Sequence, residues 1–141
     1  MSRPQVHGTT VALGEEGVLL LGPSGAGKSD LALRLIDEGA VLVADDQTAV
    51  EVSDGRAIAS APPAIAGRIE ARGLGIYAVP HRPAVRLALC VQLGPAPERL
   101  PTEARTHDIG GVALPLVHID PRLPSAPALV RLALRGRRVA P

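Results

Sequence analysis

The chain has 141 residues, and its 15 lysines and arginines against 14 aspartates and glutamates give a formal net charge of +1. This balance argues against a basic nucleic-acid surface, and Tyr77 as the sole aromatic residue argues against a platform on which bases could stack. No apolar run reaches the roughly 18 residues of a membrane helix, so we expect no nucleic-acid or membrane partner and a cytoplasmic location.

Hydrophobic residues make up 46% of the chain, which is enough for the aliphatic core of one domain. We expect this domain to span residues 1–141, with frayed tails at 1–3 and 135–141. Cys90 is the only cysteine, so no internal disulfide can form, and its place in an apolar run predicts an inert, buried thiol.

The first predicted elements follow the order strand, loop, helix, strand. Apolar runs predict short strands at 9–13 and 18–21, and the second leads into a glycine-rich loop. A helix begins near Ser29 and ends at Gly39, and the run at 41–44 is a buried strand. This order predicts a right-handed parallel βαβ unit and an α/β fold of the P-loop kinase type.

Beyond this unit, the pattern predicts additional antiparallel strands. The elements expected there are a hairpin of strands at 48–52 and 57–60, a strand at 85–93, a loop at 94–111, a strand at 112–119 and a helix at 126–134. The loop at 94–111 is proline-rich, and a loop of this length is often functional.

The loop after the second strand is a complete phosphate-binding motif in the strand–loop–helix context that the motif requires. Its residues are Gly22, Pro23, Ser24, Gly25, Ala26, Gly27, Lys28 and Ser29. The glycines let consecutive N–H groups point at a phosphate, and the helix N-terminus adds its positive dipole end. Lys28 supplies positive charge for the β- and γ-phosphates, and Ser29 a hydroxyl for Mg²⁺. The motif predicts binding of a nucleotide such as ATP, or of pyrophosphate.

Asp45 and Asp46 follow the strand next to this loop, at the edge where such sheets bind ligands. One carboxylate there typically holds Mg²⁺, which we expect of Asp45, and a second can act as a base. A plain strand-ending turn is the alternative. Because side chains alternate along an extended chain, only one carboxylate should face the γ-phosphate directly. Glu70 either completes the Mg²⁺ shell or belongs to an exposed turn, and residue types alone leave both interpretations open.

Taken together, these segments resemble the catalytic domain of HPr kinase/phosphorylase, a bacterial enzyme that acts on a serine of HPr, the phosphocarrier protein of the sugar phosphotransferase system. The resemblance spans residues 4–119, and the stretches that carry it are 7–9, 22–29, 42–46, 70–76 and 98–101. The phosphate loop is shared by many families. The Glu-x-Arg-Gly-Leu-Gly-Ile stretch, together with Val-Ala-Asp-Asp, is much more specific.

The resemblance implies roles for the matching residues and an oligomer, usually a hexamer. The implied roles are phosphate binding for Lys28, Mg²⁺ binding for Ser29 and Glu70, general-base catalysis for Asp46 with His7 beside it, and a catalytic arginine at Arg99. Residues 69–78, with Arg72, Gly73, Leu74 and Gly75, match the loop that shapes the active site and meets the protein substrate.

Two features depart from the family pattern. The chain starts almost at His7, so it looks like the family's short form. Residues 120–125 occupy the place of a basic, glycine-containing segment that contributes to dephosphorylation, and they do not match it. The expected function is therefore transfer of a phosphoryl group from ATP, or from pyrophosphate, to a serine of an HPr-like protein, with weak reverse phosphorolysis.

Two other functions remain open from the sequence. A P-loop kinase for a small molecule would use the loop at 94–111 as a substrate lid. A nucleotide-binding regulatory switch would bind and slowly hydrolyse nucleotide without an acceptor, although the chain has no Asn-Lys-x-Asp stretch for a guanine-specific switch.

Overall fold

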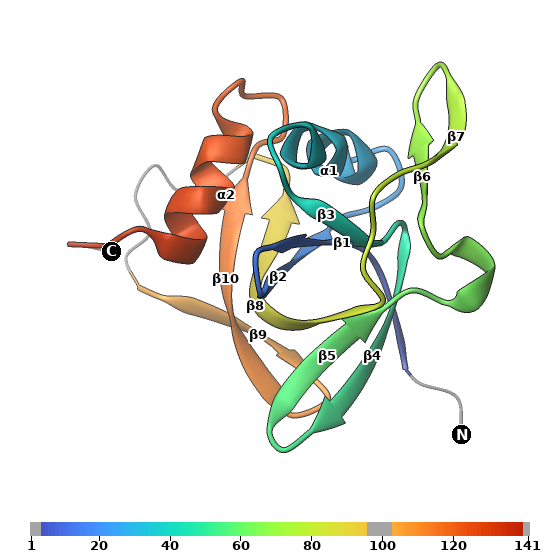
Figure 1. Ribbon diagram of the computed structural model, residues 1–141. Coiled ribbons are helices and arrows are strands. Elements are labelled where there is room, and N and C mark those ends of the chain that lie inside the picture. Colours follow the sequence, from blue (N-terminus) through green and yellow to red (C-terminus); the bar gives the residue numbers. More distant parts are fainter. Residues whose placement is uncertain (1–3, 96–102, 140–141) are drawn as a thin grey trace.

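The computed structural model describes residues 4–95 and 103–139 (Figure 1). The elements of this part, in chain order, are β1 (Gln5–Leu13), β2 (Glu16–Leu21), α1 (Lys28–Asp37), β3 (Val41–Ala44), β4 (Gln47–Ser53), β5 (Arg56–Ser60), the 3₁₀ helix η1 (Pro63–Ile65), β6 (Arg68–Ala71), β7 (Gly75–Ala78), β8 (Ala84–Leu93), β9 (Arg105–Ile109), β10 (Val112–Ile119) and α2 (Ala126–Arg135).

A closed ring of strands forms the centre of the fold. β1 pairs with β2 and β4, β4 with β5, β5 with β8, and β8 returns to β2. The sheet continues through β10, which runs parallel to the end of β8, to β9. β6 and β7 form a separate hairpin that projects from the body beside α1 (Figure 1).

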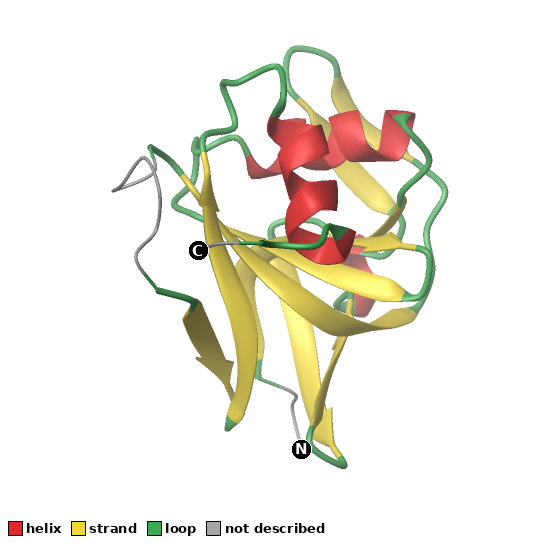
Figure 2. Ribbon diagram, turned by 90° about the vertical axis from the view of Figure 1, so that its left-hand side faces the viewer, coloured by secondary structure: helices red, strands yellow, loops and turns green. Residues whose placement is uncertain are grey.

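β2 is apolar on both faces because each face packs in a different buried cluster. Val18 and Leu20 pack in one cluster with Leu31 of α1, while Leu19 and Leu21 belong to the other. Alternate residues of one strand thus face different clusters, which accounts for the unbroken apolar run that the sequence shows there. Both helices lie on the same side of the sheet (Figure 2).

The predicted βαβ unit forms, with β1 inserted between its two strands. β2 and β3 each pair antiparallel with β1, so they run parallel to each other without touching directly. Leu21 at the end of β2 pairs with Gly8, and Ala44 at the end of β3 pairs with Thr10. The segment from His7 to Thr10 therefore lies between the carboxyl ends of the two parallel strands, where ligands of such sheets bind.

Most of the other predicted elements are confirmed. β3 and β10 have the predicted bounds, and β4, β5, β8 and α2 match to within a residue at each end, whereas β1 starts at Gln5 instead of residue 9. None of the helices in residues 4–95 and 103–139 is long and apolar enough to span a membrane.

Two predictions are wrong in part. The expected loop at 94–111 contains β9, which pairs with β10 across a turn at Gly110 and Gly111. β9 is a largely exposed, polar strand, so it lacks the alternation that marks a half-buried strand. Arg135 was expected in a frayed tail, yet it ends α2, and its guanidinium donates to the Glu16 carboxylate and to the Leu13 carbonyl.

Candidate functional site

The Gly22–Ser29 loop connects β2 to α1 and has the backbone conformation that its glycines allow. Gly25 and Gly27 have φ values of 85° and 102°, in the left-handed region that favours glycine. Ala26 N–H donates to Pro23 O at 3.0 Å, which closes a tight turn. No side chain caps the N-terminus of α1, so the main-chain amides of its first turn are available to an anion.

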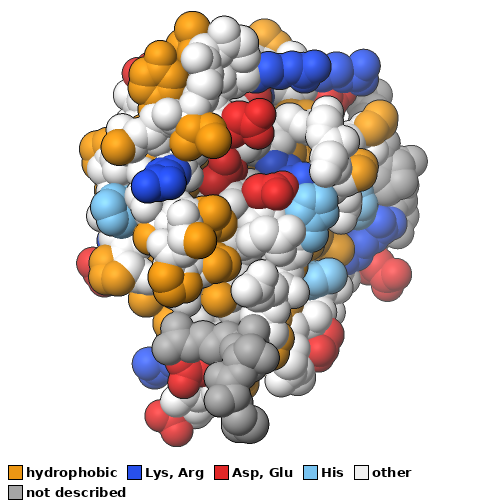
Figure 3. Space-filling view, turned by 90° about the vertical axis from the view of Figure 1, so that its right-hand side faces the viewer, with side chains coloured by type: hydrophobic (Ala, Val, Ile, Leu, Met, Phe, Trp, Pro, Cys, Tyr) orange, Lys and Arg blue, Asp and Glu red, His pale blue; other side chains and the backbone are white. Residues whose placement is uncertain are grey.

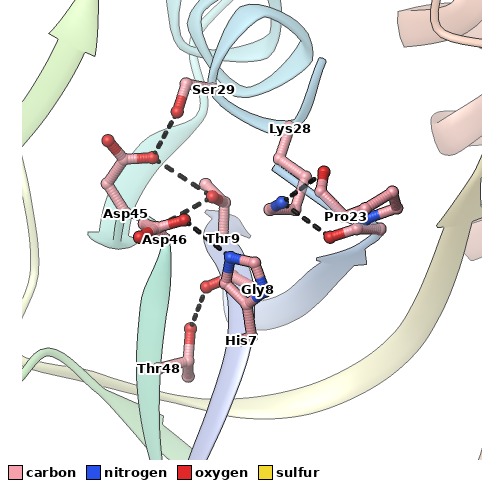
Figure 4. Close-up of polar contacts among 10 residues, drawn as sticks. His7, Gly8, Thr9, Pro23, Lys28, Ser29, Asp45, Asp46 and Thr48 are labelled. Carbon is pink, nitrogen blue, oxygen red and sulfur yellow. Dashed lines mark hydrogen bonds and ion pairs between the residues drawn. The ribbon is translucent and has the colours of Figure 1, made fainter. Parts of the chain in front are cut away.

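Lys28 lies buried against its own loop. Its Nζ donates to Gly22 O at 2.7 Å and to Pro23 O at 3.0 Å (Figure 4). An ammonium group has three N–H donors, so these two bonds leave a third for another acceptor. The loop thus holds a positive charge next to its own uncapped amides.

Asp45 is a buried carboxylate that three donors hold in place. Its Oδ1 accepts from Ser29 Oγ at 2.6 Å and from Thr9 Oγ1 at 3.1 Å, and its Oδ2 accepts from Glu70 N–H at 3.0 Å. The residue is only 8% exposed. Because donors from β1, α1 and β6 converge on it, Asp45 fixes the phosphate-loop motif to the strand end and to the projecting hairpin.

Asp46 is oriented differently, although it is the next residue. Its φ is 67°, which a non-glycine residue seldom adopts, and Gln47 N–H donates to Asp45 O across it at 2.8 Å. A bond over three residues around a positive φ is the signature of the γ-turn, a rare and strained conformation. The turn points the Asp46 side chain toward His7, with 2.9 Å between Oδ1 and His7 Nε2 (Figure 4). The carboxylate is 60% exposed.

The structure brings together most of the residues that the sequence singles out. Lys28, Ser29, Asp45, Asp46 and His7 meet at the ends of β2 and β3 (Figure 4). On one exposed face, acidic side chains gather beside histidine and basic side chains (Figure 3). The two carboxylates have different partners, but the positive φ of Asp46 separates them, not the alternation of an extended chain that the sequence suggested. That only one of them faces the γ-phosphate stays a prediction.

Other predicted residues contribute less directly. Glu70 reaches the site through its main-chain N–H, while its side chain is exposed, as β6 alternates between buried and exposed residues. Arg72, Gly73 and Leu74 form the exposed tip of the β6–β7 hairpin, and Gly75 begins β7. Arg99 lies outside the described residues. Among residues 4–95 and 103–139, no three His, Cys, Asp or Glu side chains gather closely enough to cage a metal ion by themselves.

Sequence reasoning missed the role of Thr9, which touches both aspartates. The available signal was its spacing from His7: residues two apart on a strand share a face. It also missed how residues 120–125 approach the loop, where a Cβ on Gly27 would lie 3.4 Å from Pro121. In that segment the Arg122 guanidinium binds the Asp120 carboxylate, and hydrogen bonds from Arg122 lower the pKa of Asp120.

Comparisons with known proteins point to one family. The family model of the HPr serine kinase C-terminal domain matches residues 1–125. The HPr kinase/phosphorylase of Caldicellulosiruptor bescii is 38% identical over 129 residues, which cover 82% of this chain and 42% of that protein. That of Burkholderia lata is 36% identical over 134 residues, covering 84% of this chain and 40% of the relative.

A solved structure gives the same answer for the fold. The Hpr(Ser) kinase/phosphatase of Coxiella burnetii superposes with a TM-score of 0.81 at 28% identity, covering 94% of this chain and 95% of that one. The chain spans less than half the length of the two curated relatives above. On the strength of the family match and these relatives, the chain belongs to the family of the HPr serine kinase C-terminal domain.

Proposed function

We propose that this chain transfers the γ-phosphoryl group of ATP to a serine of an HPr-like phosphocarrier protein. The proposal rests on one observation: two adjacent aspartates beside the Gly22–Ser29 loop differ in burial and in hydrogen-bond partner. Asp45 is buried and bonded to Ser29, whereas Asp46 is exposed and bonded to His7. Phosphoryl transfer to a hydroxyl needs one group near the metal and another near the attacking oxygen.

The phosphates of ATP would bind at the loop and the first turn of α1. The uncapped amides there and the remaining N–H of Lys28 supply hydrogen bonds and positive charge. Since the transition state has little covalent chemistry for the protein to perform, positioning and charge neutralisation by these groups supply most of the catalysis.

Ser29 and Asp45 fit a Mg²⁺ ion that is shared with the phosphates. Their oxygens lie 2.6 Å apart, and Mg²⁺ in such sites usually takes one or two carboxylates together with substrate phosphates. Glu70, whose main chain is bound to Asp45, is the third proposed ligand. When bound, Mg²⁺ neutralises charge on the β- and γ-oxygens.

Asp46 is the proposed general base. Its carboxylate is exposed enough for a serine hydroxyl to approach, and it accepts that hydroxyl's proton as the oxygen attacks phosphorus. His7, whose Nε2 lies 2.9 Å from Oδ1, orients the carboxylate. Arg99 is proposed as a further catalytic residue by the family pattern alone.

The β6–β7 hairpin is the proposed contact for the acceptor protein. It is joined to the site through the Glu70 N–H bond to Asp45, and it presents Leu74 and Ile76 at 75% and 73% exposure. Large apolar side chains at this exposure are typical of surfaces that bind a partner. A protein acceptor fits such a projecting surface better than a small molecule, which prefers an enclosed pocket.

The test is phosphorylation of HPr with ATP and Mg²⁺, followed by mass spectrometry, with pyrophosphate as the alternative donor. Asp46→Asn should lower kcat by about 10²–10⁴-fold and leave ATP affinity nearly unchanged, because only the base is removed. Asp54→Asn is the matched control, since Asp54 is the other aspartate with positive φ and lies in the β4–β5 turn.

The outcomes separate the assignments. Wild-type protein that leaves HPr unmodified with either donor contradicts the acceptor. Loss of ATP binding in Asp46→Asn would assign Asp46 to the metal instead of to proton transfer. Phosphorylation of a metabolite in place of HPr would identify a small-molecule kinase.

A further inference from the structure

The backbone of Asp46 is held in an unfavourable conformation by its neighbours. A left-handed conformation costs a residue with a side chain free energy that other interactions must offset. Here Gly8 N–H donates to Asp46 O at 2.9 Å, and Asp46 N–H donates to Thr9 Oγ1 at 3.0 Å. Both partners belong to β1, so this strand sets the direction in which the Asp46 carboxylate points.

Thr9 is the one residue in this group whose side chain touches both aspartates. Its hydroxyl accepts from the Asp46 amide and donates to Asp45 Oδ1 at 3.1 Å (Figure 4). A hydroxyl has a single hydrogen. Here Thr9 donates that hydrogen to the Asp45 carboxylate, and a lone pair of the same oxygen accepts from the Asp46 N–H. Thr9 is fully buried, so water does not easily replace either bond.

We propose that Thr9 is a positioning residue that couples the two aspartates: one hydroxyl fixes the carboxylate of the proposed metal ligand Asp45 and the backbone of the proposed base Asp46 relative to each other. The other buried threonines of this region do not have this arrangement. Thr10 Oγ1 bonds Thr48 Oγ1 at 2.9 Å, and Thr48 donates to Gly8 O, so this pair ties β1 to β4 without touching either carboxylate in the contacts described.

For the reaction, this inference rests on the proposed function. Suppose that Asp46 accepts the serine proton and Asp45 binds the metal. The distance between the two carboxylates then determines whether the base can reach the same serine oxygen that attacks the γ-phosphate. A displacement of about 1 Å of a catalytic group can cost about 10²-fold in rate. Thr9 would therefore act on kcat much more than on ATP binding.

The experiment uses three variants of the full chain. Thr9→Val keeps the shape of the side chain and removes the hydroxyl, Thr9→Ser restores the hydroxyl, and Thr10→Val is the matched control that deletes a neighbouring buried hydroxyl. Two quantities are measured: kcat and KM for ATP with HPr as acceptor, and the hydrogen-exchange rate of the Asp46 amide by NMR on ¹⁵N-labelled protein.

We expect Thr9→Val to lower kcat by about 10²-fold, with KM for ATP within about threefold of wild type. The Asp46 amide should exchange at least about tenfold faster in this variant, because its acceptor is gone. Thr9→Ser should return both quantities to near wild type, and Thr10→Val should change neither by more than about threefold, whatever its effect on thermal stability.

Unchanged kcat and exchange in Thr9→Val would overturn the inference, as would an equal loss of kcat in Thr10→Val or a failure of Thr9→Ser to rescue. Should Thr9→Val not fold, Thr9→Ala is held to the same expectations. An unprotected Asp46 amide in the wild-type protein would also contradict it. If wild-type protein does not phosphorylate HPr, the proposed function fails, while the exchange rates still decide whether Thr9 holds Asp46.

Discussion

At the scale of single residues, the site depends on how neighbouring groups orient a few side chains. Asp45 and Asp46 are chemically identical and adjacent, yet one is buried under three donors and the other is exposed beside a histidine. The difference comes from the positive φ of Asp46. The backbones of β1 and β2 also approach closely at Gly8. A Cβ there would lie 2.8 Å from Leu20 O, so only glycine fits at this position.

Cys90 gives a prediction about pH at this scale. Burial without a charged partner raises the pKa of its thiol to about 11, so at pH 8 the thiolate is roughly a thousandth of the total. A thiol reagent should therefore label the native protein slowly at pH 8 and the urea-unfolded protein rapidly, as followed by absorbance.

The same shift affects stability. Below about pH 9 the Cys90 thiol is protonated in both states; between about 9 and 11 the unfolded chain ionises first, so the folded state loses stability as the pH rises. Cys90→Ala is the variant with which to compare the pH dependence of wild-type stability, because replacement by serine would add a hydroxyl to an apolar site. Rapid labelling of the native protein at pH 8 would mean that the thiol is accessible.

At the scale of elements, the β6–β7 hairpin differs from the other strands because most of its surface is not packed against the body of the protein. All four residues of β7 are exposed, and an isolated two-stranded hairpin is only marginally stable in water. The buried side of β6, with Ile69 and Ala71, and the Glu70 N–H bond to Asp45 attach it to the body. Its exposed apolar residues thus contribute little to folding and are free to contact an acceptor.

Leu74→Ser tests this role. We expect KM for HPr to rise by about tenfold, because truncating an exposed apolar contact of an interface costs on the order of 1–2 kcal/mol, while KM for ATP and the melting temperature stay close to wild type. Val52→Ser, at an exposed apolar residue of β4, is the control. The β4–β5 hairpin lies at the opposite end of the molecule from the β6–β7 hairpin (Figure 1). An equal rise of KM for HPr in both variants would remove the hairpin from the interface.

At the scale of the whole molecule, the segment after β10 bears on the direction of the reaction. β10 runs parallel to β8 and delivers residues 120–125 beside the Gly22–Ser29 loop. Arg122, the basic residue of this segment, donates through Nε and Nη2 to the two oxygens of Asp120 at 3.1 and 3.0 Å. Its charge is therefore paired with the neighbouring Asp120 carboxylate.

We accordingly expect weak phosphorolysis. Phosphoserine-HPr incubated with inorganic phosphate should yield pyrophosphate at a small fraction of the forward rate, measured with a coupled pyrophosphate assay. Forward transfer from ATP in the same preparation is the control. Pyrophosphate formation at a rate comparable to forward transfer would show that residues 120–125 do not limit the reverse reaction.

Much of the fold was predictable because its signals are local. The apolar runs, Gly39 after α1 and the Asp54–Gly55 turn each mark an element within a few residues, and β3, β8 and α2 appear where expected. β7 and β9 were not predicted as strands, because polar or exposed strands carry no period-2 apolar pattern and are defined by the strands that they pair with. β6 was missed although it alternates, because its pattern covers only four residues, the shortest run that indicates a strand.

The sequence by itself determined the phosphate-loop motif, the acidic pair after β3 and the family, since each is written in consecutive residues with a fixed spacing. Only the tertiary structure decided how Asp45 and Asp46 differ and which side chain links them. Thr9 and Asp46 are 37 positions apart in the chain, and they meet because β1 lies between β2 and β3. Long-range strand pairing of this kind depends on the packing of the whole sheet, which no local pattern encodes.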